Sequence, residues 1–250
     1  MSDIDISLAE EISQFYDDPL GFVRFAYPWG EPGSSLNGFD GPDEWQIDVL
    51  TAIGEAVKER GFDGINAVDP IQVAVSSGHG IGKSALSSWL INWVMSTRPH
   101  SKGVVTANTK TMSELAKWTS LCITGHWFDV STMAIVHRAY PKTWRVDAQT
   151  CREENSEAFA GLHAASSTPW YLFDEASAIP EKIWEVAKGG LTDGEPMHIC
   201  FGNPTRNNGS FYECFRKNSH RWITRQIDSR KAKMTNKRLI QTWIDDFGED

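Results

Sequence analysis

The stretch VAVSSGHGIGKSALSSWLINW, residues 73–93, decides the fold. It begins as a short apolar run, which predicts a buried strand, and it ends in a pattern that predicts a helix. Between the two, Gly78, Gly80 and Gly82 alternate along the chain, and Lys83 follows directly. Glycine lets backbone N–H groups turn inward toward phosphate oxygens, and the start of the helix adds further donors. The stretch therefore predicts a site for a nucleoside triphosphate.

The two residues that end the predicted nucleotide loop have side chains suited to phosphate and metal binding. Lys83 can reach the β- and γ-phosphates, and the Ser84 hydroxyl can bind Mg²⁺, so ATP and Mg²⁺ are the expected cofactors. The match to GxxxxGK[ST] is imperfect because Ser77 stands in place of the first glycine. An incidental glycine turn therefore stays open, and His79 is expected to be a loop donor or a structural residue. The residues expected to bind the nucleotide here are Ser77, Gly78, His79, Gly80, Ile81, Gly82, Lys83 and Ser84.

Short apolar runs alternate with helical patterns along the rest of the chain. Helices are expected over residues 6–26, 43–60, 84–95, 111–124, 180–188, 209–217 and 236–246. Buried strands are expected over residues 69–77, 103–108, 144–146, 170–176 and 197–204. This alternation indicates βαβ units and a parallel sheet covered on both faces. We therefore predict an α/β fold, a three-layer P-loop NTPase sandwich with a mainly parallel central sheet.

Two adjacent acids, Asp174 and Glu175, follow the apolar run WYLF directly. In open parallel sheets, ligand chemistry gathers at the carboxyl ends of the strands. Phosphoryl transfer needs a carboxylate on the metal and a group that orients the attacking water. We therefore expect Asp174 to bind Mg²⁺ and Glu175 to act as the general base. The alternative is that both acids only cap the helix that begins near Pro180.

Two further segments are candidates for contact with the nucleotide. In CFGNPT, residues 200–205, a strand ends at the same sheet edge, and the Asn203 side chain could bond to the γ-phosphate or its water. A simple Asn-Pro turn is the alternative. In GPDEWQIDVL, Gln46 could read the amino group and N7 of adenine, with Trp45 packing nearby. A tryptophan on a core face is the alternative for Trp45.

Composition and charge narrow the class of protein. The chain has 250 residues, of which 40% are hydrophobic and 23% charged, as in ordinary globular proteins. No apolar run approaches the roughly 18 residues that span a bilayer, and the acidic first residues argue against a secretory signal. The four cysteines lack CxxC spacing, so we expect free thiols in a reducing compartment and no metal framework.

The net charge of −9 is unevenly distributed. Residues 1–60 carry 3 Lys or Arg against 13 Asp or Glu, whereas residues 216–238 carry 9 Lys or Arg against one Asp. A basic patch can follow a phosphate backbone by counterion release, so this segment is a candidate contact with nucleic acid. A solvated helical or loop face is the alternative.

Four segments in this order resemble the large terminase subunit of tailed phages and prophages, the motor that packages DNA into capsids. They are AEEISQFYDDPLGFVRFAYPWGEPG with GPDEWQIDVL, SGHGIGKS, AGLHAASSTPWYLFDEAS and CFGNPTRNNGSFYECF. The resemblance implies an ASCE-type, RecA-like ATPase core. It matches Gln46 to the adenine motif, residues 77–84 to a variant P-loop and residues 202–205 to the coupling motif. It also matches Asp174 to the metal carboxylate and Glu175 to the catalytic glutamate.

The sequence departs from this family at one point in the loop. Several members carry an arginine where His79 stands, so another arginine would have to contact the γ-phosphate. The resemblance leaves Arg145, Arg152 and Arg206 as candidate catalytic arginines, and we expect one of them to act from a neighbouring subunit.

The resemblance also implies the setting in which the chain works. It implies double-stranded DNA, the portal protein and the small terminase subunit as partners. It implies a homo-oligomeric ring docked on the portal in the host cytoplasm, without a membrane. We expect a helical segment with the adenine motif over 1–60, an ATPase core over 61–215 and a basic segment over 216–250. That last segment would lead to an RNase H-like nuclease that is absent here, so no DNA cleavage is expected.

Two other functions stay open. A helicase-like translocase would need a DEAD or DEAH box and a second RecA-like domain, and neither DEAS nor the chain length provides them. A non-catalytic, nucleotide-dependent assembly protein is the second alternative. The presence of Lys83, Ser84, Asp174 and Glu175 together speaks against it.

Overall fold

One sheet organises the computed structural model, which describes residues 3–106, 109–164 and 166–248. Within these residues the sheet has eight strands in the order β3-β4-β5-β2-β6-β7-β1-β8. The strands are β1 (Ile71–Ser77), β2 (Lys102–Thr106), β3 (Phe128–Val130), β4 (Ala134–His137), β5 (Arg145–Gln149), β6 (Pro169–Phe173), β7 (Met197–Gly202) and β8 (Ile223–Ile227). Only the pairs β3–β4 and β4–β5 are antiparallel. The mainly parallel sheet is therefore confirmed.

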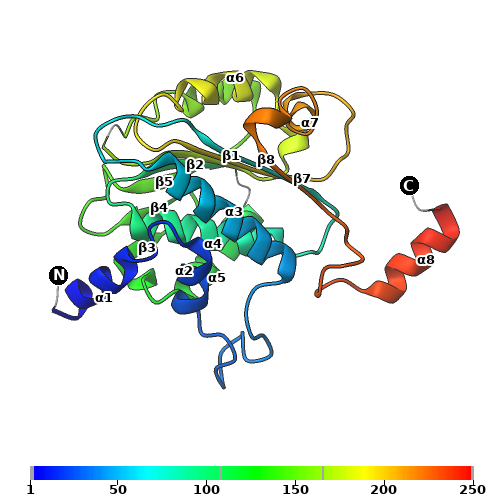
Figure 1. Cartoon of the computed structure of the whole chain (residues 1–250), viewed down its shortest axis with the longest axis horizontal. Helices are drawn as coiled ribbons and strands as arrows, with labels where there is room; N and C mark the ends of the chain where they lie inside the picture. The colour runs from blue at the N-terminus through cyan, green and yellow to red at the C-terminus, as the bar shows by residue number, and fades with distance from the viewer. Residues whose placement is uncertain (1–2, 107–108, 165, 249–250) are drawn as a thin grey trace.

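Helices cover both faces of this sheet. Figure 1 shows α6 and α7 on one face, and α2, α3, α4 and α5 on the other. The α-helices are α1 (Asp3–Ser13), α2 (Pro19–Ala26), α3 (Glu44–Arg60), α4 (Lys83–Thr97), α5 (Thr109–Leu121), α6 (Glu181–Gly189), α7 (Ser210–Cys214) and α8 (Lys237–Phe247). Short 3₁₀ turns are η1 (Gly125–Trp127), η2 (Glu153–Phe159), η3 (Ala176–Ala178) and η4 (Ser219–Arg221). The predicted three-layer sandwich is confirmed.

The central strands are mostly apolar because both of their faces are buried. Val73 and Val75 of β1 point into the core beneath α3 and α4, whereas Ala74 points into the core beneath α6. Successive side chains of a strand alternate between faces, so a strand with helices on both sides needs no polar alternation. This is why the stretch quoted above begins with consecutive apolar residues, Val73, Ala74 and Val75.

The N-terminal segment differs from the prediction of one helix over residues 6–26. It forms two helices, α1 and α2, with a break between them. The Asp18 side chain caps α2 by accepting a hydrogen bond of 2.8 Å from the backbone N–H of Gly21. Pro19 occupies the first helical position, where its missing N–H costs nothing. A proline with a capping aspartate before it starts a new helix and does not continue the old one.

Three strands were not predicted from the sequence. The strands β3 and β4 are short and lie at one edge of the sheet. The strand β8 lies inside the basic segment and pairs in parallel with β1, with Ser77 opposite Ile227. The sheet therefore continues past residue 215, where the predicted ATPase core ends. The last two residues of the predicted strand 103–108 lie outside the described residues. In the described part of the chain, no helix is long and apolar enough to cross a membrane.

Candidate nucleotide site

The glycine loop connects β1, which ends at Ser77, to α4, which begins at Lys83. Gly80 and Gly82 have φ angles of +74° and +93°, in the left-handed region that favours glycine. Gly82 is the N-cap of α4, and within the described chain no side chain caps that helix start. The first amides of α4 therefore remain directed toward the loop, as an anion site requires.

Lys83 joins the loop to the neighbouring strand. Its Nζ donates to the carbonyl oxygen of Gly78 at 2.6 Å, to Ser77 Oγ at 3.1 Å and to Asn203 Oδ1 at 2.7 Å. Burial lowers the pKa of Lys83, while the nearby charges of Asp174 and Glu175 oppose that shift. The ammonium group is therefore held within the electrostatic reach of both acids.

Asn203 joins residues 202–205, the predicted coupling motif, to the glycine loop. Its amide nitrogen lies 2.6 Å from Nε2 of His79, while its amide oxygen accepts from Lys83. The structure thus brings together three of the predicted site residues, His79, Lys83 and Asn203. Ile81 is buried and anchors the loop in the core, whereas the Ser84 side chain is exposed at the start of α4.

The two acids lie at the carboxyl end of β6. Burial raises the pKa of Asp174, the charge of Glu175 adds to the shift, and Lys83 opposes it. Glu175 is exposed and has a φ of +52°, which is rare for a residue with a side chain. Both acids line an open cleft of about 270 Å³. The other residues that line this cleft include Thr106, Thr111, Gln149, Thr150 and Cys151.

The donors present fit a magnesium ion that would bind together with a nucleotide. Ser84 offers a hydroxyl oxygen and Asp174 a carboxylate oxygen, which are hard ligands of the kind that Mg²⁺ takes alongside phosphates and waters. The described residues hold no cluster of three or more His, Cys, Asp or Glu that could bind a metal by itself. A metal here would therefore depend on phosphate oxygens for the rest of its ligands.

The predicted adenine motif lies against the end of the loop. Gln46 is 3% exposed, and its Oε1 accepts from the backbone N–H of Asp43 at 2.8 Å, which forms a capping box at the start of α3. Its Nε2 donates to the carbonyl oxygen of Gly82 at 3.2 Å. Trp45 is 9% exposed and belongs to the main core cluster. Both ends of the Gln46 amide are thus engaged within the protein.

The three candidate arginines lie in different places. Arg145 lies at the amino end of β5, opposite Lys102, and is paired with Asp147, so the structure does not bring it to the site of its own subunit. Arg152 is exposed and directly follows Cys151, which lines the cleft of the two acids. Arg206 is exposed and shares a second cleft with Gly78.

Two contacts to the site were not predicted. The Thr106 side chain binds the backbone of Asp174. The turn after β8 lies against the loop, because a Cβ placed on Gly78 would be 2.6 Å from Ser229 Oγ, and one on Gly82 would be 3.3 Å from Met234 Sδ. Both contacts join segments far apart in the sequence, and no local pattern predicts such a pairing.

Comparisons with known proteins agree with this geometry. No protein-family model matches the chain. Over 151 residues it is 28% identical to the probable large terminase subunit of Enterobacteria phage P7, a match that covers 56% of this chain and 30% of that protein. The chain therefore corresponds to less than a third of that relative's length.

Several solved structures share the fold. The large terminase of a thermophilic bacteriophage in complex with ADP aligns with a TM-score of 0.59 at 14% identity, over 81% of this chain and 50% of that one. The HK97 bacteriophage large terminase aligns with a TM-score of 0.56 at 9% identity, over 92% and 47%. A mutant of the Thermus phage P74-26 large terminase ATPase domain aligns with a TM-score of 0.51 at 12% identity, over 85% and 92%. The resemblance indicated by the motifs is thus confirmed, and the chain has the P-loop fold of phage large terminase ATPase domains.

Proposed function

We propose that this chain is the ATP-hydrolysing motor domain of a phage large terminase, which drives double-stranded DNA into a procapsid. One observation carries the proposal: the glycine loop, Lys83, the pair Asp174–Glu175 and Asn203 converge at one edge of the sheet. The similarity to the phage P7 protein and to a terminase bound to ADP supports it. The partners proposed with this function are the portal protein, the small terminase subunit and further copies of the chain in a ring, in the host cytoplasm.

In this proposal the loop amides bind the phosphates of ATP, and Lys83 exchanges the Gly78 carbonyl for the β- and γ-phosphate oxygens. Ser84 and Asp174 would hold Mg²⁺, which would supply positive charge beside the phosphates. Glu175 accepts a proton from the water that attacks the γ-phosphorus, and ADP is the leaving group.

Asn203 is proposed to report the state of the nucleotide. Its Oδ1 is bonded to Lys83 in this structure, so a lysine that turns toward the phosphates leaves the amide free to bond the γ-phosphate or its water. One of the three candidate arginines, Arg145, Arg152 or Arg206, is proposed to act from a neighbouring subunit and to stabilise the transition-state charge.

Adenine is proposed to bind beside Gln46 and Trp45. Base binding there would exchange the contact between Gln46 Nε2 and Gly82 for a bond to N7 of the ring, while Oε1 accepts from the exocyclic amine. Gln46→Ala should therefore weaken ATP binding more than GTP binding. Equal weakening of the two nucleotides would restrict Gln46 to its structural contacts.

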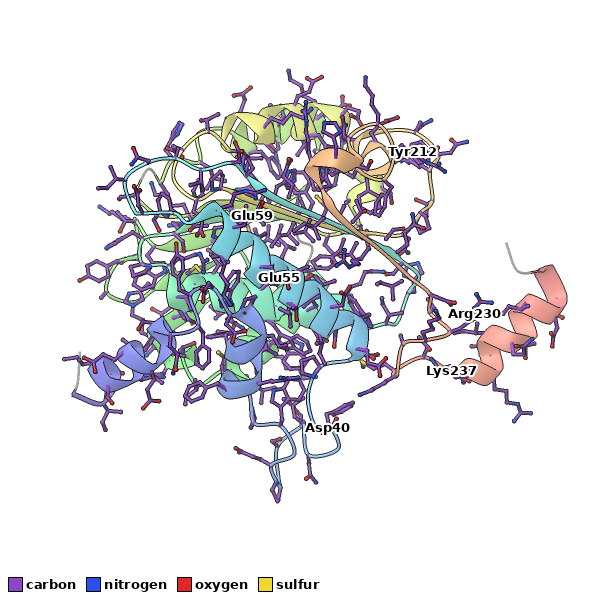
Figure 2. All side chains as sticks on the ribbon, in the orientation of Figure 1. Asp40, Glu55, Glu59, Tyr212, Arg230 and Lys237 are labelled. Atoms are coloured by element: carbon purple, nitrogen blue, oxygen red, sulfur yellow. The ribbon has the colours of Figure 1, made fainter. Side chains whose placement is uncertain are left out.

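Phosphate release from ATP and Mg²⁺, with and without double-stranded DNA, tests the proposed hydrolysis. We expect Glu175→Gln to lower turnover by about 100-fold or more while nucleotide binding remains, because the general base alone is removed. Glu55→Gln is the matched control, because Figure 2 shows Glu55 on α3, an element other than β6 and its acids. Equal, near-zero rates for wild type and Glu175→Gln at high protein concentration would favour a non-catalytic assembly protein.

The basic segment is proposed to contribute to the surface that contacts DNA. Part of its charge is paired within the protein, because Arg225 contacts Asp48 and Arg230 contacts Asp228. The positions proposed for the DNA contact are Arg216, Lys217 and Arg221. Charge reversal at these three should reduce DNA-stimulated hydrolysis and leave basal hydrolysis unchanged. Unchanged stimulation would remove the segment from the DNA contact.

A further inference from the structure

One side chain holds the backbone from which Glu175 projects. Thr106 ends β2 and lies opposite Phe173 in the neighbouring strand β6. Its hydroxyl accepts a hydrogen bond of 2.7 Å from the backbone N–H of Asp174 and donates one of 3.1 Å to the carbonyl oxygen of the same residue. Thr106 is only 4% exposed, so solvent competes little for these bonds. Both backbone groups of Asp174 are thus held by a single hydroxyl.

The residue that follows has an unusual backbone conformation. Glu175 has φ and ψ of +52° and +41°, the left-handed region that side chains disfavour. Such a conformation persists where the surrounding contacts fix it, and it is found preferentially at functional sites. Its backbone N–H donates to Asp174 Oδ1 at 3.0 Å, and its carbonyl accepts from the N–H of Ala178 at 2.9 Å. Glu175 is therefore fixed through its backbone on both sides.

The carboxylate of Glu175 has no comparable support. Among the described residues, no hydrogen bond or ion pair to that carboxylate is seen, and the side chain is exposed to the cleft. The backbone at residues 174 and 175 therefore sets the direction in which the Glu175 side chain leaves the chain. A group that holds this backbone fixes the starting point from which the carboxylate reaches into the cleft.

The surroundings of Thr106 also keep its hydroxyl in place. Cys151 lies within hydrogen-bonding reach of Thr106, and burial raises the pKa of that thiol to about 11. The thiol therefore stays neutral at ordinary pH and adds no negative charge beside Asp174.

We propose that Thr106 is a positioning residue for ATP hydrolysis: its hydroxyl fixes the Asp174 backbone and thereby directs the Glu175 carboxylate at the attacking water. The inference rests on the proposed function of Glu175 as general base. Displacement of a catalytic group by about 1 Å can cost about 100-fold in rate, so loss of this hydroxyl should be visible in turnover. In this role Thr106 acts through the backbone of Asp174.

The test compares Thr106→Val, which keeps the shape and removes the hydroxyl, with Thr106→Ser, which keeps the hydroxyl. We expect kcat for ATP hydrolysis to fall about 10- to 100-fold in Thr106→Val, with KM for ATP within about twofold of wild type. Thr106→Ser should stay within about threefold of wild type in both constants. Thr119→Val is the matched control, because the buried Thr119 hydroxyl bonds to Asn92 Oδ1 at 3.0 Å between α5 and α4, and neither residue lines the cleft of the two acids.

Three results would overturn the inference. They are an unchanged kcat in Thr106→Val, an equal loss in the valine and serine variants, and a rise in KM without a fall in kcat. If Thr106→Val does not fold, the serine variant and Thr106→Ala replace it in the same comparison. Failure of the proposed function would look different, because wild type would then be inactive or Glu175→Gln would be as active as wild type.

Discussion

A histidine inside the sheet gives a prediction whose size can be worked out. His198 lies on β7, is 1% exposed, and faces a cluster of aromatic rings. Its ring centroid lies 4.6 Å from that of Phe173 and 5.3 Å from that of Trp184. Its Nε2 has no hydrogen-bond partner among the described residues. Burial lowers the pKa of His198 to about 3, and the charge of Lys188 adds to the shift.

The shift makes the stability of the protein depend on pH. In the unfolded chain a histidine titrates near pH 6.5. Below that pH the unfolded state binds a proton at this position and the folded state does not. Above about pH 6.5 the ring is neutral in both states and does not affect the free energy of unfolding. Below that pH the free energy of unfolding decreases as the pH falls toward 3. One pKa unit corresponds to about 1.4 kcal/mol, so the loss between pH 7 and pH 5 is about 2 kcal/mol.

The variant His198→Phe should remove this loss, because an aromatic ring remains and the titrating group is gone. Urea unfolding at pH 7 and at pH 5 gives the free energy of unfolding for wild type and variant. We expect the wild type to lose about 2 kcal/mol more than the variant between the two pH values. His220→Phe is the control, because that histidine is exposed. Equal losses in wild type and His198→Phe would refute the reasoning, whatever their absolute stabilities.

Three further predictions concern the core and the site. Gly103→Ala should lower the free energy of unfolding by about 3 kcal/mol, because its Cβ would lie 2.2 Å from the buried ring of Trp170; an unchanged urea midpoint would contradict this. Gln46→Ala should cost about 1–2 kcal/mol, because the Asp43 N–H loses its partner and the Gly82 carbonyl keeps only its bond from the Leu86 N–H, and thermal unfolding measures this loss. Arg152→Ala should lower ATP turnover at least about 10-fold with nucleotide affinity nearly unchanged, and a loss of affinity in a binding titration would count against its proposed role.

The sequence predicted those parts of the site that depend on neighbours along the chain. A strand, a glycine loop and a helix follow one another within residues 73–93, and the acids stand at the end of their own strand, so local rules suffice. Asn203 was predicted to lie at the site because an apolar run that predicts a strand ends beside it and a turn follows. The sequence could not rank the arginines, because Arg145 and Arg152 differ by which end of β5 they lie at.

Patterns of neighbouring residues could not predict which distant segments pair with one another. Ile223–Ile227 has three polar residues in a row between two isoleucines and lies among basic residues, so no apolar run marked the strand that pairs with β1. Thr106 was part of a predicted strand, but its bond to Asp174 follows from the register of β2 with β6. Register is fixed by packing across the whole sheet, and a single segment does not contain that information.

The pairing of β8 with β1 has a mechanical consequence. The strand that carries the glycine loop is hydrogen-bonded to the last strand of the sheet, and the turn beyond it reaches back to Gly78 through Ser229. From this turn the chain continues past Arg230 into α8, which begins at Lys237 and stands apart from the main body (Figures 1 and 2). An 11-residue helix is about 16 Å long, so a rotation of roughly 10° at the turn would carry its far end about 3 Å. The position of α8 is thus set by a turn that contacts the glycine loop.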